Sequence, residues 1–188
     1  MKIWQIESII LLKTFKYINM LSNTIQNALN KQISVEGNSS QIYLAMASWA
    51  EVQGFEGIST FMYAQSDEER MHMLKLVKYV NQRGGVAKIS STVEPVLDLS
   101  NYKTLFKQLL IHEEKVSESI NELVGITLDE RDYATHNFLQ WYVSEQIEEE
   151  ANARYILDKI NLIGDDKGGL YLFDNEMKNF TSPIPPAK

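Results

Sequence analysis

The chain has 188 residues, 44% of them hydrophobic, which is enough for one domain with a sizeable core. Its formal net charge of −7 disfavours a nucleic-acid-binding protein, because such proteins usually carry a basic patch. The absence of cysteine excludes disulfides, thiolate zinc sites, iron–sulfur clusters and cysteine nucleophiles. Any metal ion must therefore be held by His, Glu, Asp or Gln, which suit iron, manganese and zinc.

The first 19 residues are apolar and basic, but Glu7 interrupts them and the purely apolar run is only Ile9–Leu12. A membrane-spanning helix needs about 20 apolar residues, and a secretory signal needs a small-residue cleavage site, so we expect neither. Two interpretations stay open. Residues 1–19 are either a loosely packed N-terminal extension or a segment upstream of a natural start at Met20, and we favour the second.

From Met20 onward the pattern predicts an all-α protein. Proline is absent up to Pro95 and again up to Pro183, while apolar residues recur at spacings of three and four. Glycines at 54, 84–85 and 164 give stop signals. The expected helices cover about 23–52, from the 54–57 turn to 83, 101–126 and 129–163, with a short fifth helix in 170–177 and a disordered tail at 181–188.

Loop lengths predict how these helices are connected. Short turns join the first helix to the second and the third to the fourth, so each pair should be antiparallel. Residues 86–100 form a long irregular connection, which can run the length of the bundle and make the second and third helices parallel. The predicted fold is a four-helix bundle with one long crossover and a short fifth C-terminal helix, in a single domain over residues 20–180.

Polar residues interrupt the apolar stripe of every long helix near its midpoint. All are of metal-ligating types: Glu36 on the first helix, Glu69 and His72 on the second, Glu113 on the third, and Gln146 and Glu149 on the fourth. Two side chains three residues apart share a helix face and can bind one ion. Buried carboxylates that face one another repel, and a cation removes that repulsion.

This pattern is close to that of dinuclear iron bundles, in which two helices each give one Glu and two give Glu-x-x-His. Only the fourth helix departs from this pattern, because it has Gln146-x-x-Glu149 in place of Glu-x-x-His. A single Glu-x-x-His often lies on a solvated face by chance, so the coincidence on four helices carries the prediction. His112 and His136 have no ligand-spaced partner on an apolar stripe, and we interpret them as surface or hydrogen-bonded histidines.

Several segments resemble the bacterial non-haem ferritins of the ferritin-like superfamily. They are EGNSSQIYLAMASWAEVQGFEGISTFMYAQSDEERMHM (36–73), INELV (120–124) and NFLQWYVSEQIEEE (137–150), and GLYLFDNEM (169–177) is similar to the start of that family's fifth helix. The likeness covers roughly residues 20–180. It implies a ferritin-like bundle and an iron-storage protein with ferroxidase activity, which oxidises Fe²⁺ with O₂ or H₂O₂ and stores ferric oxide-hydroxide.

The resemblance also implies roles for individual residues. Glu36, Glu69 and His72 match one iron site, with Glu69 bridging two irons. Glu113 and Glu149 match ligands of the second iron, with Gln146 beside it. Glu68, Glu145 and Glu148, sharing Glu149, match a third iron site, and Tyr43 matches a tyrosine next to the diiron centre that can donate an electron.

Assembly and cofactors follow from the same resemblance. The family forms hollow shells of 24 subunits, so we expect a cytoplasmic homo-oligomer with no nucleic-acid or membrane partner. Haem-binding bacterioferritins carry Met where this chain has Arg70, and Glu-x-x-His on the last long helix, so we expect no haem.

Two alternative functions stay open for a bundle with such a centre. A diiron-carboxylate oxidase acting on an organic substrate would need a pocket that opens onto the irons, and the bulky Tyr43 and Tyr142 argue against one. A storage shell with little catalysis would lack part of the ligand set, which is complete in this sequence.

Overall fold

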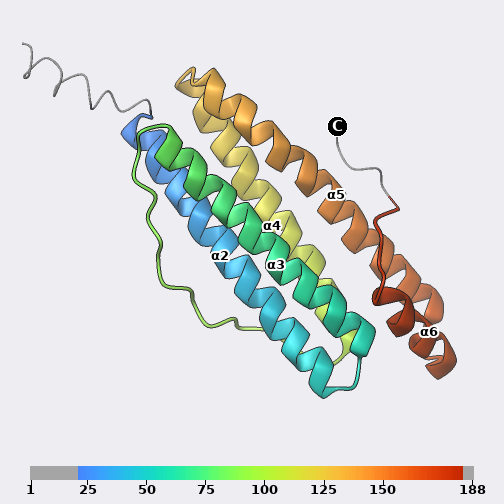
Figure 1. The fold of residues 1–188 in the computed structure, drawn as a ribbon. Coiled ribbons are helices and arrows are strands. Elements are labelled where there is room, and N and C mark those ends of the chain that lie inside the picture. The colour runs from blue at the N-terminus through green and yellow to red at the C-terminus, as the bar shows by residue number, and fades with distance from the viewer. Residues whose placement is uncertain (1–20, 184–188) are drawn as a thin grey trace, which may run out of the picture.

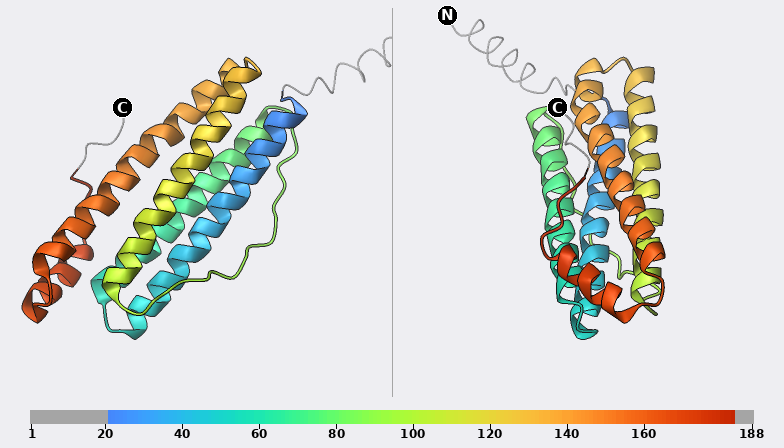
Figure 2. Two further views of the ribbon diagram at one scale, coloured as in Figure 1. Left: turned by 180° about the vertical axis from the view of Figure 1, so that it is seen from behind. Right: turned by 90° about the vertical axis from the view of Figure 1, so that its right-hand side faces the viewer.

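The computed structural model describes residues 21–183 (Figures 1 and 2). Its helices are α2 (Asn23–Val52), α3 (Glu56–Gln82), α4 (Tyr102–Asp129), α5 (Tyr133–Ile163) and α6 (Lys167–Met177). The all-α prediction is confirmed. The interpretations of the N-terminal 19 residues and of tail residues 184–188 lie outside the described residues. In the described part of the tail, Ser182 Oγ donates to Asn152 Oδ1 at 2.9 Å.

The connections confirm the predicted topology (Figures 1 and 2). α2 and α3 form one antiparallel hairpin, α4 and α5 form another, and residues 85–99 run back along the bundle without regular structure, so α3 and α4 are parallel. Side chains of α2 hold this crossover. Asn30 donates to the carbonyl of Val86 at 3.1 Å and accepts from the amide of Lys88 at 2.8 Å.

Side-chain caps define where the helices begin. Asn101 Oδ1 accepts from the amide of Thr104 at the start of α4, and Asp132 Oδ1 accepts from that of Thr135 at the start of α5. The expected start of the fourth helix near residue 129 was wrong by four positions. α4 continues to Asp129, and a turn with Arg131 at φ 56° separates the two helices.

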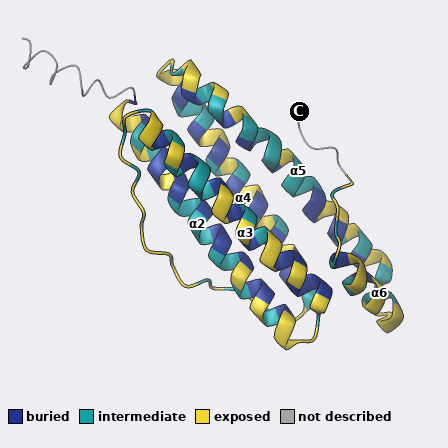
Figure 3. Cartoon of the chain, viewed as in Figure 1, coloured by how far each residue is buried: buried dark blue, intermediate teal, exposed yellow. Residues whose placement is uncertain are grey.

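Buried residues follow the inner faces of the helices (Figure 3). They form two apolar clusters, one nearer α6 around Met46, Phe106 and Ile156, and one at the opposite end around Leu29 and Leu76. Fully burying one such side chain contributes about 1.5–3 kcal/mol. On each long helix the polar interruptions fall between the two clusters, so the apolar contacts at both ends hold the polar centre together. No helix within residues 21–183 combines the length and apolar composition of a membrane span.

α6 closes one end of the bundle by docking on the start of α3. Phe173 and Met177 are buried in the core, and Asp174 Oδ1 accepts from the amides of Gly57 at 3.1 Å and Ile58 at 2.9 Å. These bonds satisfy amides at the start of α3, because the N-cap residue Phe55 has no side chain that can accept from them. A Cβ on Gly57 would lie 1.5 Å from the backbone oxygen of Asp174, so this contact requires glycine.

We therefore expect Gly57→Ala to displace α6 and to destabilise the fold by on the order of 3 kcal/mol, through overpacking and the loss of two hydrogen bonds. Gly125→Ala is the matched control. Gly125 lies inside α4, and a Cβ added there would meet no atom within 4 Å, so alanine should stabilise the helix by up to about 1 kcal/mol. Thermal unfolding followed by circular dichroism measures both changes. Equal midpoints for the two variants would contradict the proposed contact.

Candidate metal centre

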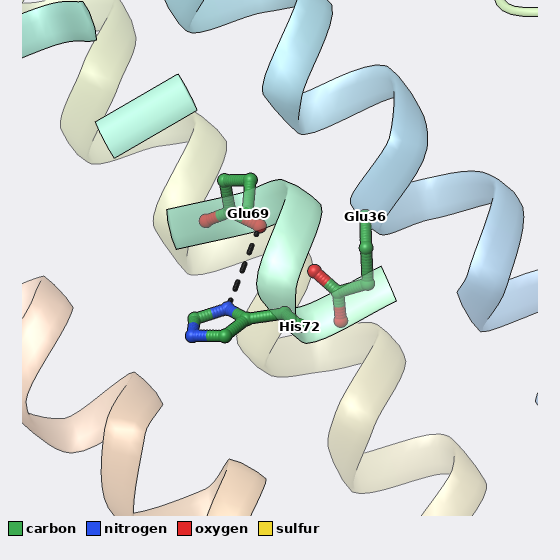
Figure 4. Close-up of side chains that lie close together, drawn as sticks. All are labelled: Glu36, Glu69 and His72. Carbon is green, nitrogen blue, oxygen red and sulfur yellow. Dashed lines mark ion pairs between the residues drawn. The ribbon is translucent and has the colours of Figure 1, made fainter. Parts of the chain in front are cut away.

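At the centre of the bundle, three predicted ligands from two helices lie close together. Glu36 of α2 and Glu69 and His72 of α3 each offer one ligand atom, and these atoms lie within 4.8 Å of one another (Figure 4). The three residues are 1%, 4% and 3% exposed. Glu69 Oε2 lies 3.7 Å from His72 Nδ1, which is too long for a hydrogen bond but leaves room for an ion between the side chains.

Several oxygen atoms at this centre have no hydrogen-bond donor among the described residues. Three are carboxylate oxygens, Glu36 Oε2, Glu69 Oε2 and Glu113 Oε1. The hydroxyl of Tyr43 also lacks a hydrogen-bond partner there. Leaving a buried acceptor unsatisfied costs about 1–3 kcal/mol, and more for a charged group. A cation bound by the carboxylates would satisfy the three oxygens. Carboxylate oxygen with one imidazole is a donor set that suits iron, manganese or zinc.

The raised pKa values of the buried carboxylates also favour a bound cation. Burial raises the pKa of Glu69 to about 7 and that of Glu113 to about 7. Burial, and then the neighbouring charge of Glu69, raise the pKa of Glu36 well above its usual value. Without a cation, the centre therefore retains protons near neutral pH. A metal ion would take their place.

α4 and α5 supply the other predicted ligands. Glu113 is 1% exposed, and Gln146 Nε2 donates to its Oε2 at 3.2 Å, which leaves Oε1 free. Glu149 is only partly covered by its neighbours, and burial followed by the charge of Glu113 raises its pKa. Within residues 21–183, neither Glu113 nor Glu149 falls in a cluster as tight as that of Glu36, Glu69 and His72. Tyr43 is fully buried in the adjoining apolar cluster.

A second cluster lies beside the first. Glu68, His72 and Glu145 also place ligand atoms within 4.8 Å of one another, so His72 is common to both clusters. Glu68 and Glu145, with Glu148 and Glu149, line a cavity of about 200 Å³ whose other walls include Gln65, Asn152 and Phe180. The four carboxylates predicted to form a third site thus share one cavity. The spacing of four between Glu68 and His72 places them on one helix face, but only the packing of α3 against α5 brings Glu145 to them.

Of the further neighbours of the centre, Tyr142 was predicted to lie near it, whereas Trp141 and Gln32 were not. Trp141 packs edge-on against the His72 ring with 5.2 Å between ring centroids, and Tyr142 Oη donates to the His72 carbonyl at 2.8 Å. Gln32, one turn before Glu36, donates to Glu36 Oε1 at 2.9 Å. Its spacing of four from Glu36 was a signal in the sequence, because it places an amide on the same helix face.

The interpretation of His112 as a hydrogen-bonded histidine is confirmed. Its Nε2 lies 2.9 Å from Ser39 Oγ, and burial lowers its pKa to about 4. Its ring is edge-on to that of Tyr43, with 5.7 Å between centroids. His136 contacts the amide of Gln140 at 3.3 Å and lies away from the metal-ligating clusters.

Comparison with known proteins agrees with this arrangement. The ferritin-like domain family matches residues 26–163. A probable bacterial non-haem ferritin-like protein of Haemophilus influenzae is 42% identical over 163 residues, which cover 87% of this chain and 99% of that protein. The bacterial non-haem ferritin of Campylobacter jejuni is 41% identical over 160 residues, covering 85% and 96%.

Solved structures give the same result. An open pore ferritin from the archaeon Archaeoglobus fulgidus superposes with a TM-score of 0.84 at 40% identity, and the match covers 87% of this chain and all of that one (100%). The resemblance found in the sequence is thereby confirmed. The chain belongs to the ferritin family and, within it, to the bacterial non-haem ferritins.

Proposed function

We propose that this protein oxidises Fe²⁺ at a dinuclear site inside each bundle and stores the product as ferric oxide-hydroxide in a hollow shell of identical subunits. The observation that carries the proposal is the set of buried carboxylate oxygens without donors, those of Glu36 and Glu69 being clustered with His72. Relatives named as bacterial non-haem ferritins support iron as the ion. A cytoplasmic location belongs to the same proposal.

The proposed ligands divide between two irons. Glu36, Glu69 and His72 would bind the first, Glu69 would be shared with the second, and Glu113 and Glu149 would complete the second with Gln146 beside them. Two Fe²⁺ ions give one electron each to O₂, which takes up two protons and leaves as H₂O₂. With H₂O₂ as oxidant, the same two electrons and two protons yield water.

The acidic cavity supports onward movement of the product. Carboxylates prefer the harder Fe³⁺ to Fe²⁺. Gln146 brings no charge to the second iron, so that site should hold Fe³⁺ less tightly than a carboxylate would. Glu68, Glu145, Glu148 and Glu149 in the adjacent cavity then form the proposed third site. A cavity walled by carboxylates suits a cation better than an organic substrate, which favours ferroxidase over the oxidase alternative.

Removing a ligand of the first iron should abolish rapid oxidation. Glu69→Ala and His72→Ala each leave the remaining side chains unable to complete the site, so the initial rate of Fe²⁺ oxidation in air should fall by at least about tenfold. His136→Ala is the control, because His136 lies outside both clusters. Stopped-flow absorbance of ferric species measures the rates. Wild-type rates in both ligand variants would refute the assignment.

Metal binding should release protons in a pH-dependent manner. Below about pH 7, Glu69 and Glu113 hold protons in the metal-free protein, because burial raises their pKa to about 7. A bound ion displaces these protons. Above about pH 7 these two carboxylates are ionised even without a metal, so the number of protons released per Zn²⁺ should be larger at pH 6 than at pH 8. Calorimetric titration with redox-inert Zn²⁺ in two buffers of different ionisation enthalpy measures the number of protons released. Equal release at both pH values would contradict the prediction.

The size of the native particle separates the shell from a lone bundle. The polypeptide has a mass of 21.6 kDa, and a shell of 24 subunits, as in the family, would be a particle of roughly 500 kDa. Gel filtration with light scattering should give that size. After Fe²⁺ addition in air, electron microscopy should show a dense core within it. A monomer or dimer that turns over iron without forming a core would favour the diiron oxidase.

A further inference from the structure

A chain of two hydrogen bonds leads from α4 to the carboxylate of Glu36 on α2. Ser119 Oγ donates to Gln32 Oε1 at 2.7 Å, and Gln32 Nε2 donates to Glu36 Oε1 at 2.9 Å. Gln32 and Glu36 are each 1% exposed. A buried amide engaged at both ends is held in one orientation, which makes it suited to position another side chain.

The Gln32 amide is held at both ends in one orientation. The Ser119 hydroxyl donates to its oxygen, and its NH₂ group donates to the Glu36 carboxylate, which as an ion can only accept. The opposite orientation would set the amide oxygen against Glu36 Oε1, so that two acceptors would face each other. The hydroxyl therefore satisfies the amide oxygen in the orientation that gives one oxygen of Glu36 a donor.

The other oxygen is left available to the metal centre. Glu36 Oε2 accepts no hydrogen bond among the described residues, and Glu36 belongs to the cluster with Glu69 and His72. The same arrangement occurs on α4, where the Gln146 amide donates to Glu113 Oε2 and Oε1 stays free. In both Glu36 and Glu113, therefore, one carboxylate oxygen accepts a hydrogen bond from a glutamine and the other has no donor.

We propose that Gln32, oriented by Ser119, is a positioning residue that makes Glu36 bind metal through Oε2 alone. This inference rests on the proposed function, since it concerns the same iron ligand. The pair acts from the α2–α4 side, where Gln32, Ser119 and Glu122 line a small cavity of about 30 Å³. The acidic cavity of Glu68 and Glu145 is lined instead by residues of α3, α5 and the segment after α6, so the two sets of side chains can be varied separately.

Co²⁺ binding under anaerobic conditions tests the proposal without iron oxidation. Gln32→Leu and Ser119→Ala should each weaken the first Co²⁺ bound by about 10–100-fold, the usual effect of losing a hydrogen-bonding partner of a ligand. Both should also change the intensity of the visible Co²⁺ absorption bands, because Glu36 is then free to bind through both oxygens. Ser119→Thr keeps the hydroxyl and should keep the wild-type affinity and spectrum. Asn121→Leu, which alters an exposed amide two residues from Ser119, is the control.

The outcomes separate this inference from the proposed function. If Glu69→Ala abolishes tight Co²⁺ binding while Gln32→Leu and Ser119→Ala bind with wild-type affinity and spectrum, the positioning role is wrong and the metal centre stands. If Glu69→Ala leaves Co²⁺ binding unchanged, the metal centre itself is wrong. A lower unfolding temperature with unchanged Co²⁺ affinity and spectrum would assign Gln32 a purely structural role. Ser119→Ala removes only one oxygen atom, so it tests the proposal even if Gln32→Leu fails to fold.

Discussion

Mutual repulsion among buried carboxylates is the constraint around which this bundle is organised. Glu36, Glu69 and Glu113 are each at most 4% exposed, and their free oxygens have no donors among the described residues. Burying an ionised carboxylate without compensation is costly enough that the group takes up a proton instead, as the raised pKa values show. Apolar clusters on both sides of this centre supply the contacts that keep the helices together despite this cost.

Neighbouring donors decide which carboxylate oxygens remain available. Gln32 engages one oxygen of Glu36 and Gln146 engages one oxygen of Glu113. The backbone that carries His72 is fixed by Tyr142, whose hydroxyl donates to the His72 carbonyl. A site held in this way is preorganised, so an ion that binds meets ligands already in place and little side-chain entropy is lost.

The centre also differs between its two sides. Towards α4, the Gln32–Ser119 pair and the apolar core enclose Glu36. Towards α5, the carboxylates of Glu68 and Glu145 open into a polar cavity, and His72 contributes to the clusters on both sides. This difference gives a direction for iron in the proposed function, from a closed oxidation site into an acidic cavity, since cations move toward accumulated negative charge.

The helices, their connections and the types of ligand could all be predicted from the amino-acid sequence. Spacings of three and four are local properties of a helix, so Glu69 with His72, and Glu36 on its stripe, could be identified from periodicity alone. The start of α5 was misplaced because Asp132, rather than a residue near 129, caps that helix. The contacts between helices follow only from the fold. Examples are Glu145 beside His72, the hydrogen bond from Ser119 to Gln32, and the capping of α3 by Asp174. Such contacts depend on how helices rotate and pack against one another, which the periodicity of a single helix does not specify.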